Sequence, residues 1–395
     1  MQLTKSKLAS LFAEKVSELQ EEPGFQWSED RITYKTDKEG SPEIKVAPGN
    51  VPLEYDIWEG LRNPAQLGRH PAGLRKIWEY YAHKRRDSTD ETGRRTIFQV
   101  PESFQFAQEE YNRALLVSVM LPFSSKLLND YNEHAGENSS SHIFSRMYED
   151  VNKMIDKATS RVAIDLVADD NVVVAMDNRT VEELSREALP ETKQGESHGP
   201  CKGGNFPQKS LAVLLGLGQF GVSRLIIRDE LKGDTVERFM GPIRSIVVFD
   251  KDKPVKDGGG GVGYPDKRWR EFLTDLFDFN KAGSDLNDYR YCRYPAESAT
   301  CGKCRDRCPS GAQKNSSPES AGNYSPEVKN QPHRFWDGEL QFDFAQCCEK
   351  RGQMNDLFPE WSCAHCLSAC VTEGVKDPNS VKNFQNKLEE LLKVN

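Results

Sequence analysis

The sequence predicts an α/β (α+β) fold followed by a small cysteine-rich module. Three features of its 395 residues support this prediction. Apolar residues follow helical spacing in several segments, and short apolar runs of strand length lie between those segments. Nine of the ten cysteines lie in the C-terminal third. A chain of this length can bury a sizeable core and suggests about two domains.

The sequence of residues 1–110 predicts a mostly helical N-terminal region. Their first segment has apolar residues at helical spacing, namely Leu8, Leu11, Phe12, Val16 and Leu19. The segment lacks the apolar stretch of a signal peptide, and no run in the chain is long enough to span a bilayer. We therefore expect a cytoplasmic protein, or the mature form of an exported one.

The sequence of residues 111–285 predicts a central domain of alternating helices and strands. The apolar run 114–123 has the length of a buried strand, and residues 171–178 and 244–250 predict two more strands. Residues 142–158 carry apolar side chains on one helical face.

A glycine-rich turn lies within the central domain. The stretch "GLGQFG", with Gly216, Gly218 and Gly221, matches the spacing of a dinucleotide-binding fingerprint. That fingerprint needs a strand before the glycines and a helix after them. Residues 209–231 predict the reverse, a helix, then the glycine turn, then a strand. The glycines do permit close backbone approach to a large planar ligand.

The cysteines of residues 286–375 form two copies of the pattern Cys-x2-Cys-x3-Cys. The first copy consists of Cys301, Cys304 and Cys308, and the second of Cys363, Cys366 and Cys370. Such runs bind iron–sulfur clusters, and in two-cluster ferredoxins the last cysteine of each run ligates the other cluster. This rule assigns Cys301, Cys304 and Cys370 to one cluster, and Cys363, Cys366 and Cys308 to the other.

Each predicted cluster still needs a fourth thiolate. The candidates lie upstream of the two motifs, and they are Cys292 and one of the adjacent pair Cys347 and Cys348. The alternative is a zinc site, because two Cys-x2-Cys pairs can form one tetrahedral centre. Zinc would leave the third cysteine of each motif without a function. We interpret His365, inside the second motif, as a neighbour of sulfur and not as a ligand.

The order of these motifs resembles the corrinoid-dependent reductive dehalogenases, which share their core with the epoxyqueuosine reductases. The resemblance covers roughly residues 140–375, through "GLGQFGVSRLIIRDEL", "GPIRSIVVFDKDKP", "CPSGA" and "FWDGELQFDFAQC". It implies a nitroreductase-like domain over 111–285 that binds base-off cobalamin. It also implies a ferredoxin-like domain with two [4Fe-4S] clusters over 286–375. Beyond the resemblance, apolar residues at helical spacing predict a C-terminal helix at 376–395.

The resemblance implies cleavage of a carbon–halogen bond at cobalamin Co(I), with electrons delivered through the two clusters. The implied partners are a small halogenated organic substrate and an electron donor protein, and the chain could form a homodimer. At the position of the family's catalytic tyrosine stands Phe144, and Tyr148 lies one turn further along. The other implied site residues are Asn178 and Arg244 for catalysis, and Gly216, Gly218, Phe220 and Gly221 for cobalamin.

Two other functions stay open at this point. An epoxyqueuosine-reductase-like enzyme would act on tRNA, but a net charge of −8 argues against a nucleic-acid partner. A two-cluster electron carrier without a catalytic centre would not need so large a central domain, but Phe144, which has no acidic proton, keeps this alternative open. Without the resemblance, we would interpret Arg244 as a surface charge at the end of a strand. We would interpret Asn178 as a turn residue and Tyr148 as an aromatic residue at the edge of the core. Val371 stands where the family has proline.

Overall fold

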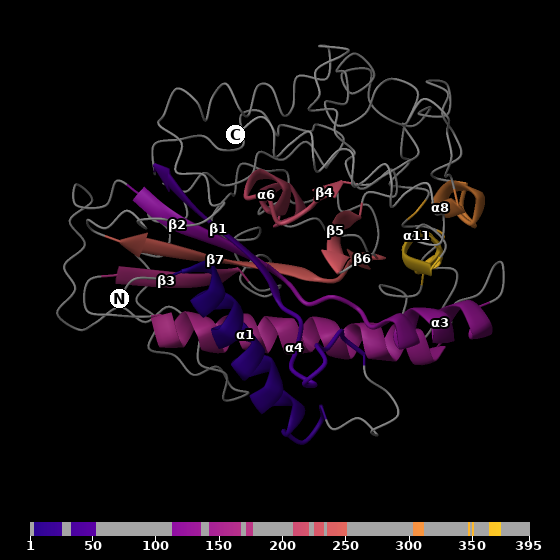
Figure 1. Cartoon of the computed structure of the whole chain (residues 1–395), viewed down its shortest axis with the longest axis horizontal. Coiled ribbons are helices and arrows are strands. Elements are labelled where there is room, and N and C mark those ends of the chain that lie inside the picture. Colours follow the sequence, from indigo (N-terminus) through magenta and orange to yellow (C-terminus); the bar gives the residue numbers. More distant parts are fainter. Residues whose placement is uncertain are drawn as a thin grey trace, which may run out of the picture.

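The computed structural model describes residues 4–25, 33–52, 113–135, 142–166, 171–176, 208–220, 225–232, 235–250, 303–311, 347, 350 and 363–372. Within these ranges the fold is α+β, with helices packed against antiparallel sheets (Figure 1). None of the helices in these ranges is both long and apolar enough to cross a membrane.

The main sheet has four strands in the order β1-β2-β7-β3. These strands are β1 (Lys45–Pro52), β2 (Arg113–Met120), β7 (Ile243–Asp250) and β3 (Asn171–Met176), and each neighbouring pair is antiparallel. The strands predicted at 114–123, 171–178 and 244–250 are thereby confirmed as β2, β3 and β7.

Strand β1 lies inside the region predicted to be mostly helical, where no strand was expected. Its sequence, KVAPGNVP, contains two prolines and a glycine, which are typical of turns. Proline lacks the N–H that a central strand must donate, so it is confined to sheet edges. Among the strands that the structure describes, β1 pairs with β2 alone and forms the edge of the sheet, where Pro48 lies opposite Val117.

Helices α1 (Lys5–Gln20) and α4 (His142–Leu166) lie along one face of the sheet (Figure 1). The apolar faces that the sequence predicted are buried in both helices. In α1 the side chain of Thr4 caps the first turn, because its hydroxyl accepts a hydrogen bond from the Lys7 N–H at 3.2 Å. Helices α1 and α4 and this face of the sheet share one apolar core.

The opposite face of the sheet is covered by α6 (Gln208–Leu214), which packs on β2 and β7. Neighbouring residues Leu116 and Val117, whose side chains point to opposite faces, are both fully buried. A sheet covered on both faces needs apolar residues throughout, and this explains why these strands appear as continuous apolar runs.

A smaller sheet follows α6, with strands β4 (Gln219–Phe220), β5 (Ile226–Lys232) and β6 (Thr235–Phe239). Between α6 and β4, Gly216 adopts a φ of +74°, a left-handed conformation that favours glycine. The predicted order of helix, glycine turn and strand is confirmed. It is the reverse of a dinucleotide-binding unit, which needs a strand before the glycines.

Three further helices bring the cysteine motifs to the end of the core. Helix α3 (Ser125–His134) contacts α4, and it also contacts α11 (His365–Thr372), which carries the second motif. Helix α8 (Lys303–Asp306) belongs to the first motif and packs against α11 (Figure 1). The predicted helix at 376–395 lies outside the described residues.

Candidate functional site

The candidate site is a group of thiols carried by α8, α11 and the segment at residue 347. The cysteines in the described ranges are all free of disulfide bonds, and they are Cys304, Cys308, Cys347, Cys363, Cys366 and Cys370. Cys304 and Cys308 are buried, each with 8% of its surface exposed. Cys292, Cys301 and Cys348, which the sequence also proposed as ligands, lie outside the described residues.

The ionisation of Cys366 is influenced by other cysteines of this group. The residue keeps some exposed surface, but protein atoms surround its thiol. This burial raises the pKa of the Cys366 thiol well above its ordinary value, and the charges of Cys363, Cys347, Cys308 and Cys370 raise it further. Four thiols from three separate segments are therefore close enough to Cys366 to act on its ionisation. We call these five cysteines the thiol group.

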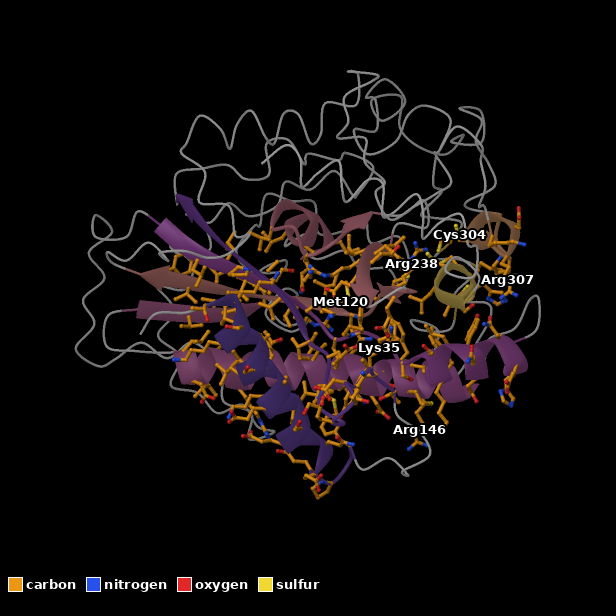
Figure 2. All side chains as sticks on the ribbon, in the orientation of Figure 1. Lys35, Met120, Arg146, Arg238, Cys304 and Arg307 are labelled. Carbon is orange, nitrogen blue, oxygen red and sulfur yellow. The ribbon has the colours of Figure 1, made fainter. Side chains whose placement is uncertain are left out.

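Arg238 on β6 connects the thiol group to the small sheet (Figure 2). Its Nη1 donates to the carbonyl oxygen of Cys370 at 3.3 Å and to the Cys370 Sγ at 3.4 Å. Its Nε and Nη2 donate to the two carboxylate oxygens of Asp229 at 2.8 and 2.7 Å. The side chains of Arg238 and Asp229 are only 4% and 5% exposed, so a buried cation is held against a cysteine sulfur.

Tyr131 on α3 holds the start of α11. Its hydroxyl lies 2.5 Å from Nδ1 of His365 and accepts a hydrogen bond from the N–H of Ala364 at 3.1 Å. The same His365 nitrogen is 3.7 Å from the Sγ of Cys363. His365 therefore lies beside a cysteine sulfur and forms part of the contact between α3 and α11.

The first cysteine motif is also connected to α3. Nη1 of the exposed Arg307, just after α8, donates to the side-chain oxygen of Asn132 at 2.8 Å. The Sγ of Cys308 lies 3.3 Å from the hydroxyl oxygen of Ser310. Within the described ranges, no group of three or more His, Cys, Asp or Glu side chains is placed so that it could hold a metal ion.

Phe144, at the predicted catalytic tyrosine position, is part of the core. It is fully buried, and its ring packs edge-on against Tyr131 with centroids 4.7 Å apart. Tyr148 is partly buried, and its ring centroid lies 5.7 Å from that of Phe144 and 5.2 Å from that of Phe123. The two predicted residues thus share one side of α4, as their spacing implied.

Arg244 is buried, with 5% of its surface exposed, so the alternative reading as a surface charge is wrong. Its guanidinium forms a two-pronged ion pair with Asp156 on α4, and one contact, from Nη2 to Oδ2, measures 3.1 Å. Nη2 also donates to the Asn152 side chain at 3.1 Å, and Nη1 donates to the Ile243 carbonyl at 2.8 Å. These contacts attach the start of β7 to α4.

The predicted cobalamin-binding glycines lie at the turn after α6. At Gly218 a Cβ atom would lie 2.6 Å from the Ile227 carbonyl oxygen, so the backbone that approaches this glycine closely is strand β5 of the same chain. Gly216 is exposed, with nothing within 4 Å of its Cβ position. Phe220 ends β4 opposite Ile226. Gly221 and Asn178 lie outside the described residues.

A group of buried polar atoms lies on the α6 face of the sheet. Among the described residues, the hydroxyls of Ser118 and Ser245, directly opposite one another on β2 and β7, have no hydrogen-bond partner, and neither does the side-chain oxygen of Gln208 on α6. The amide nitrogen of Gln208 donates to the Met176 carbonyl at 2.9 Å, and Met176 pairs with Ser245. Buried polar atoms without partners are unusual, and they are candidates for contacts with a bound ligand.

Sequence reasoning missed Arg238, Asp229 and Tyr131. Asp229 and Arg238 lie directly opposite one another on β5 and β6, so a hairpin prediction for residues 226–239 could have paired them. No sequence signal relates Arg238 to Cys370, which is 132 positions away. Tyr131 gave no signal either, because an aromatic residue on a helix usually packs in a core.

Comparisons with known proteins identify no relative of this chain. No protein-family model matches it, and neither does any curated protein or any solved structure.

Proposed function

We propose that the chain is a reductive dehalogenase that uses a corrinoid and two [4Fe-4S] clusters. The observation that supports this best is the thiol group, in which thiols from three segments lie close enough to Cys366 to raise its pKa. The enzymatic part of the proposal rests on the order of the sequence motifs. No nucleic acid is among the proposed partners.

The thiol group favours an iron–sulfur cluster over zinc. A structural zinc ion and a [4Fe-4S] cluster both take four thiolates, but a zinc site built from the two Cys-x2-Cys pairs would leave the third cysteine of each motif, Cys308 and Cys370, without a function. The members of the thiol group include Cys308, Cys363 and Cys366, the set that the crossover rule assigns to one cluster, together with Cys347 as the fourth ligand. Burial and the charges of the neighbouring thiols oppose ionisation of Cys366, so a positively charged iron centre would supply the compensation that its thiolate needs.

The proposed corrinoid site is the α6 face of the main sheet. The unpartnered atoms of Ser118, Ser245 and Gln208 are buried between α6 and the sheet, so they could exchange hydrogen bonds with the amide side chains of a corrin ring only if α6 moves away from the sheet. Gly216 can lie close to a ligand, because its Cβ position is open. When bound, the corrinoid would supply the strongly reducing centre that carbon–halogen cleavage requires. No described histidine is proposed as its ligand.

The proposed reaction consumes an organohalide, two electrons and one proton, and it produces the hydrogenated carbon compound and a halide ion. The phenol of Tyr148 is the proposed proton donor, because Phe144 cannot donate and Tyr148 lies beside it. Arg244, which the resemblance assigns to catalysis, is a cation of the kind that can stabilise the developing negative charge. Its guanidinium is bound to Asp156 and Asn152. It could therefore act in the reaction only through those partners, or after its hydrogen bonds to them break.

A two-cluster electron carrier is the second candidate function. It is favoured by the engagement of Arg244 with Asp156, by the complete burial of Phe144, and by the closeness of β5 to Gly218. All three observations give structural functions to residues that the resemblance assigned to catalysis or to the corrinoid.

Anaerobic reconstitution of the full chain with iron, sulfide and hydroxocobalamin tests both functions. We expect about eight iron atoms per chain, because each cubane contains four. Cys366→Ser should lose about half of the iron, whereas Cys201→Ser, outside both motifs, should lose none. Stoichiometric zinc without acid-labile sulfide would contradict the cluster proposal.

The corrinoid is tested in the same samples. The paramagnetic resonance spectrum of the Co(II) form should lack splitting from an axial nitrogen, and reduced protein should release halide from an aryl halide. Tyr148→Phe should reduce halide release about a hundredfold with iron and corrinoid content unchanged. Full iron content without any corrinoid binding would identify the chain as an electron carrier.

A further inference from the structure

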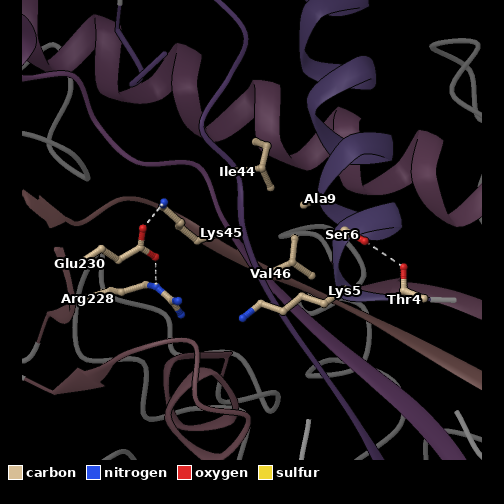
Figure 3. A pocket seen from close by; sticks show the side chains of 9 residues that line it. All are labelled: Thr4, Lys5, Ser6, Ala9, Ile44, Lys45, Val46, Arg228 and Glu230. Carbon is tan, nitrogen blue, oxygen red and sulfur yellow. Dashed lines mark hydrogen bonds and ion pairs between the residues drawn. The ribbon is translucent and has the colours of Figure 1, made fainter. Parts of the chain in front are cut away.

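A cleft of about 540 Å³ lies between α1, β1 and β5, on the face of the β5–β6 hairpin that is turned away from Cys370. This volume is within the range of small-molecule sites. The residues that line it are Thr4, Lys5, Ser6, Ala9, Ile44, Lys45, Val46, Arg228 and Glu230 (Figure 3).

The two faces of the hairpin follow from strand alternation. Arg228 and Glu230 point into the cleft, whereas Asp229 between them points to the opposite face and pairs with Arg238. The cleft is therefore separate from the thiol group, and its function does not depend on the proposed clusters or corrinoid.

Positive charge is in excess in this cleft. Lys5, Lys45 and Arg228 supply three cations and Glu230 supplies one carboxylate. Glu230 is already engaged, because one of its oxygens accepts from Lys45 at 2.7 Å and the other accepts from Arg228 at 2.6 Å. Arg228 also donates to the Leu217 carbonyl at 3.1 Å, which fixes its guanidinium at the cleft.

Lys5 is the cation of the cleft that takes no part in the hydrogen bonds among Glu230, Lys45 and Arg228. Its ammonium group points toward Arg228 across the cleft (Figure 3), and among the described residues it has neither a hydrogen bond nor an ion pair. Burial lowers the pKa of Lys5, and the charge of Arg228 lowers it further. An anion between the two side chains would relieve this repulsion. Ala9, Ile44 and Val46 form an apolar wall beside the charges.

We propose that this cleft binds a small molecule that carries a doubly charged anionic group, such as a phosphate monoester, on an apolar body. Lys5 and Arg228 would hold the anionic group from opposite sides, and the apolar wall would contact the rest of the molecule. Two charges on the ligand match the two positive charges that remain after Glu230 is counted.

Calorimetric titration of the full chain with phenyl phosphate tests the proposal. We expect one site, weaker binding of inorganic phosphate, and no binding of phenol. Lys5→Met should weaken phenyl phosphate binding about tenfold or more, because a charged hydrogen bond is lost. Lys5→Arg should retain most of the affinity. Lys7→Met, an exposed position on the same turn of α1, should bind like the unmodified protein.

Absence of phenyl phosphate binding at millimolar concentration would overturn the proposal, as would equal losses for Lys5→Met and Lys7→Met. A second readout does not depend on folding of the variants. In protein whose lysines carry ¹³C-methyl labels, the ligand should raise the pKa of Lys5 toward its ordinary value. Binding that leaves the Lys5 resonance unchanged would place the ligand elsewhere and overturn the assignment.

Discussion

Arg238 and Asp229 form an ion pair that is almost completely buried. Replacing one partner alone should therefore lower the free energy of unfolding more than replacing both. Arg238→Met leaves the Asp229 carboxylate buried and unpaired, which should cost about 3–5 kcal/mol of unfolding free energy. The double variant Arg238→Met/Asp229→Leu should be clearly more stable than the single one, because no buried charge remains. Urea unfolding measures both, and equal losses would contradict the expectation.

The hydrogen bond from Arg238 to the Cys370 Sγ should influence the reduction potential of a reconstituted cluster. Hydrogen bonds to cluster sulfurs favour the reduced state, which carries more negative charge. Arg238→Met/Asp229→Leu removes this bond without changing the net charge, so the potential should become more negative. A redox titration followed by paramagnetic resonance measures the shift. The matched control is Arg228→Met/Glu230→Leu, on the other face of β5. An equal shift in the control would refute the role of Arg238.

At the scale of elements, Phe144 packs at the contact of α4 with α3. Phe144→Tyr would restore the family's catalytic residue in sequence, and the resemblance implies that it leaves activity intact or raises it. The structure predicts a cost in stability, because the new hydroxyl enters a fully buried position between Tyr131 and Phe123. A buried hydroxyl without a partner costs about 1–3 kcal/mol. Denaturant unfolding should show this loss, with a smaller effect for Tyr148→Phe. Unchanged stability of Phe144→Tyr would mean that the hydroxyl finds a partner.

The stability of the whole molecule should decrease in alkaline solution through Tyr34. This residue is 2% exposed, and its hydroxyl donates to the Gln20 side chain at 2.7 Å at the end of α1. Burial, and then the charge of Glu21, raises the pKa of Tyr34 from 10.0 to about 12. Between these values the unfolded chain has lost the proton that the folded chain retains, so the free energy of unfolding falls as pH rises.

Urea unfolding at several pH values between about 9 and 12 measures this effect. Below pH 10 the contribution of Tyr34 is constant, and it is progressively lost as the pH approaches about 12. Tyr34→Phe should be less stable at pH 9, because it loses the bond to Gln20, but its stability should depend less steeply on pH. Parallel pH profiles for the two proteins would show that other groups cause the decrease.

Local patterns in the sequence were sufficient for much of the fold. The buried face of α1 was readable from its helical spacing, and β2, β3 and β7 were readable as apolar runs. The glycine turn was readable because the left-handed backbone of Gly216 favours a residue without a side chain. The two cysteine motifs were visible because ligands of one cluster recur at short spacing. Each of these features depends on residues that lie close together in the sequence.

Contacts between distant segments were decided only by the tertiary structure. Strand β1 forms despite its prolines because β2 offers an edge to pair with, and an isolated segment does not reveal such an edge. Arg244 is buried because Asp156, 88 positions away, meets its guanidinium. Arg238 reaches Cys370, and Lys5 faces Arg228, only after the small sheet has docked between α1 and α11. Side-chain periodicity records which face of an element is buried, but it carries no information about the partner that buries it.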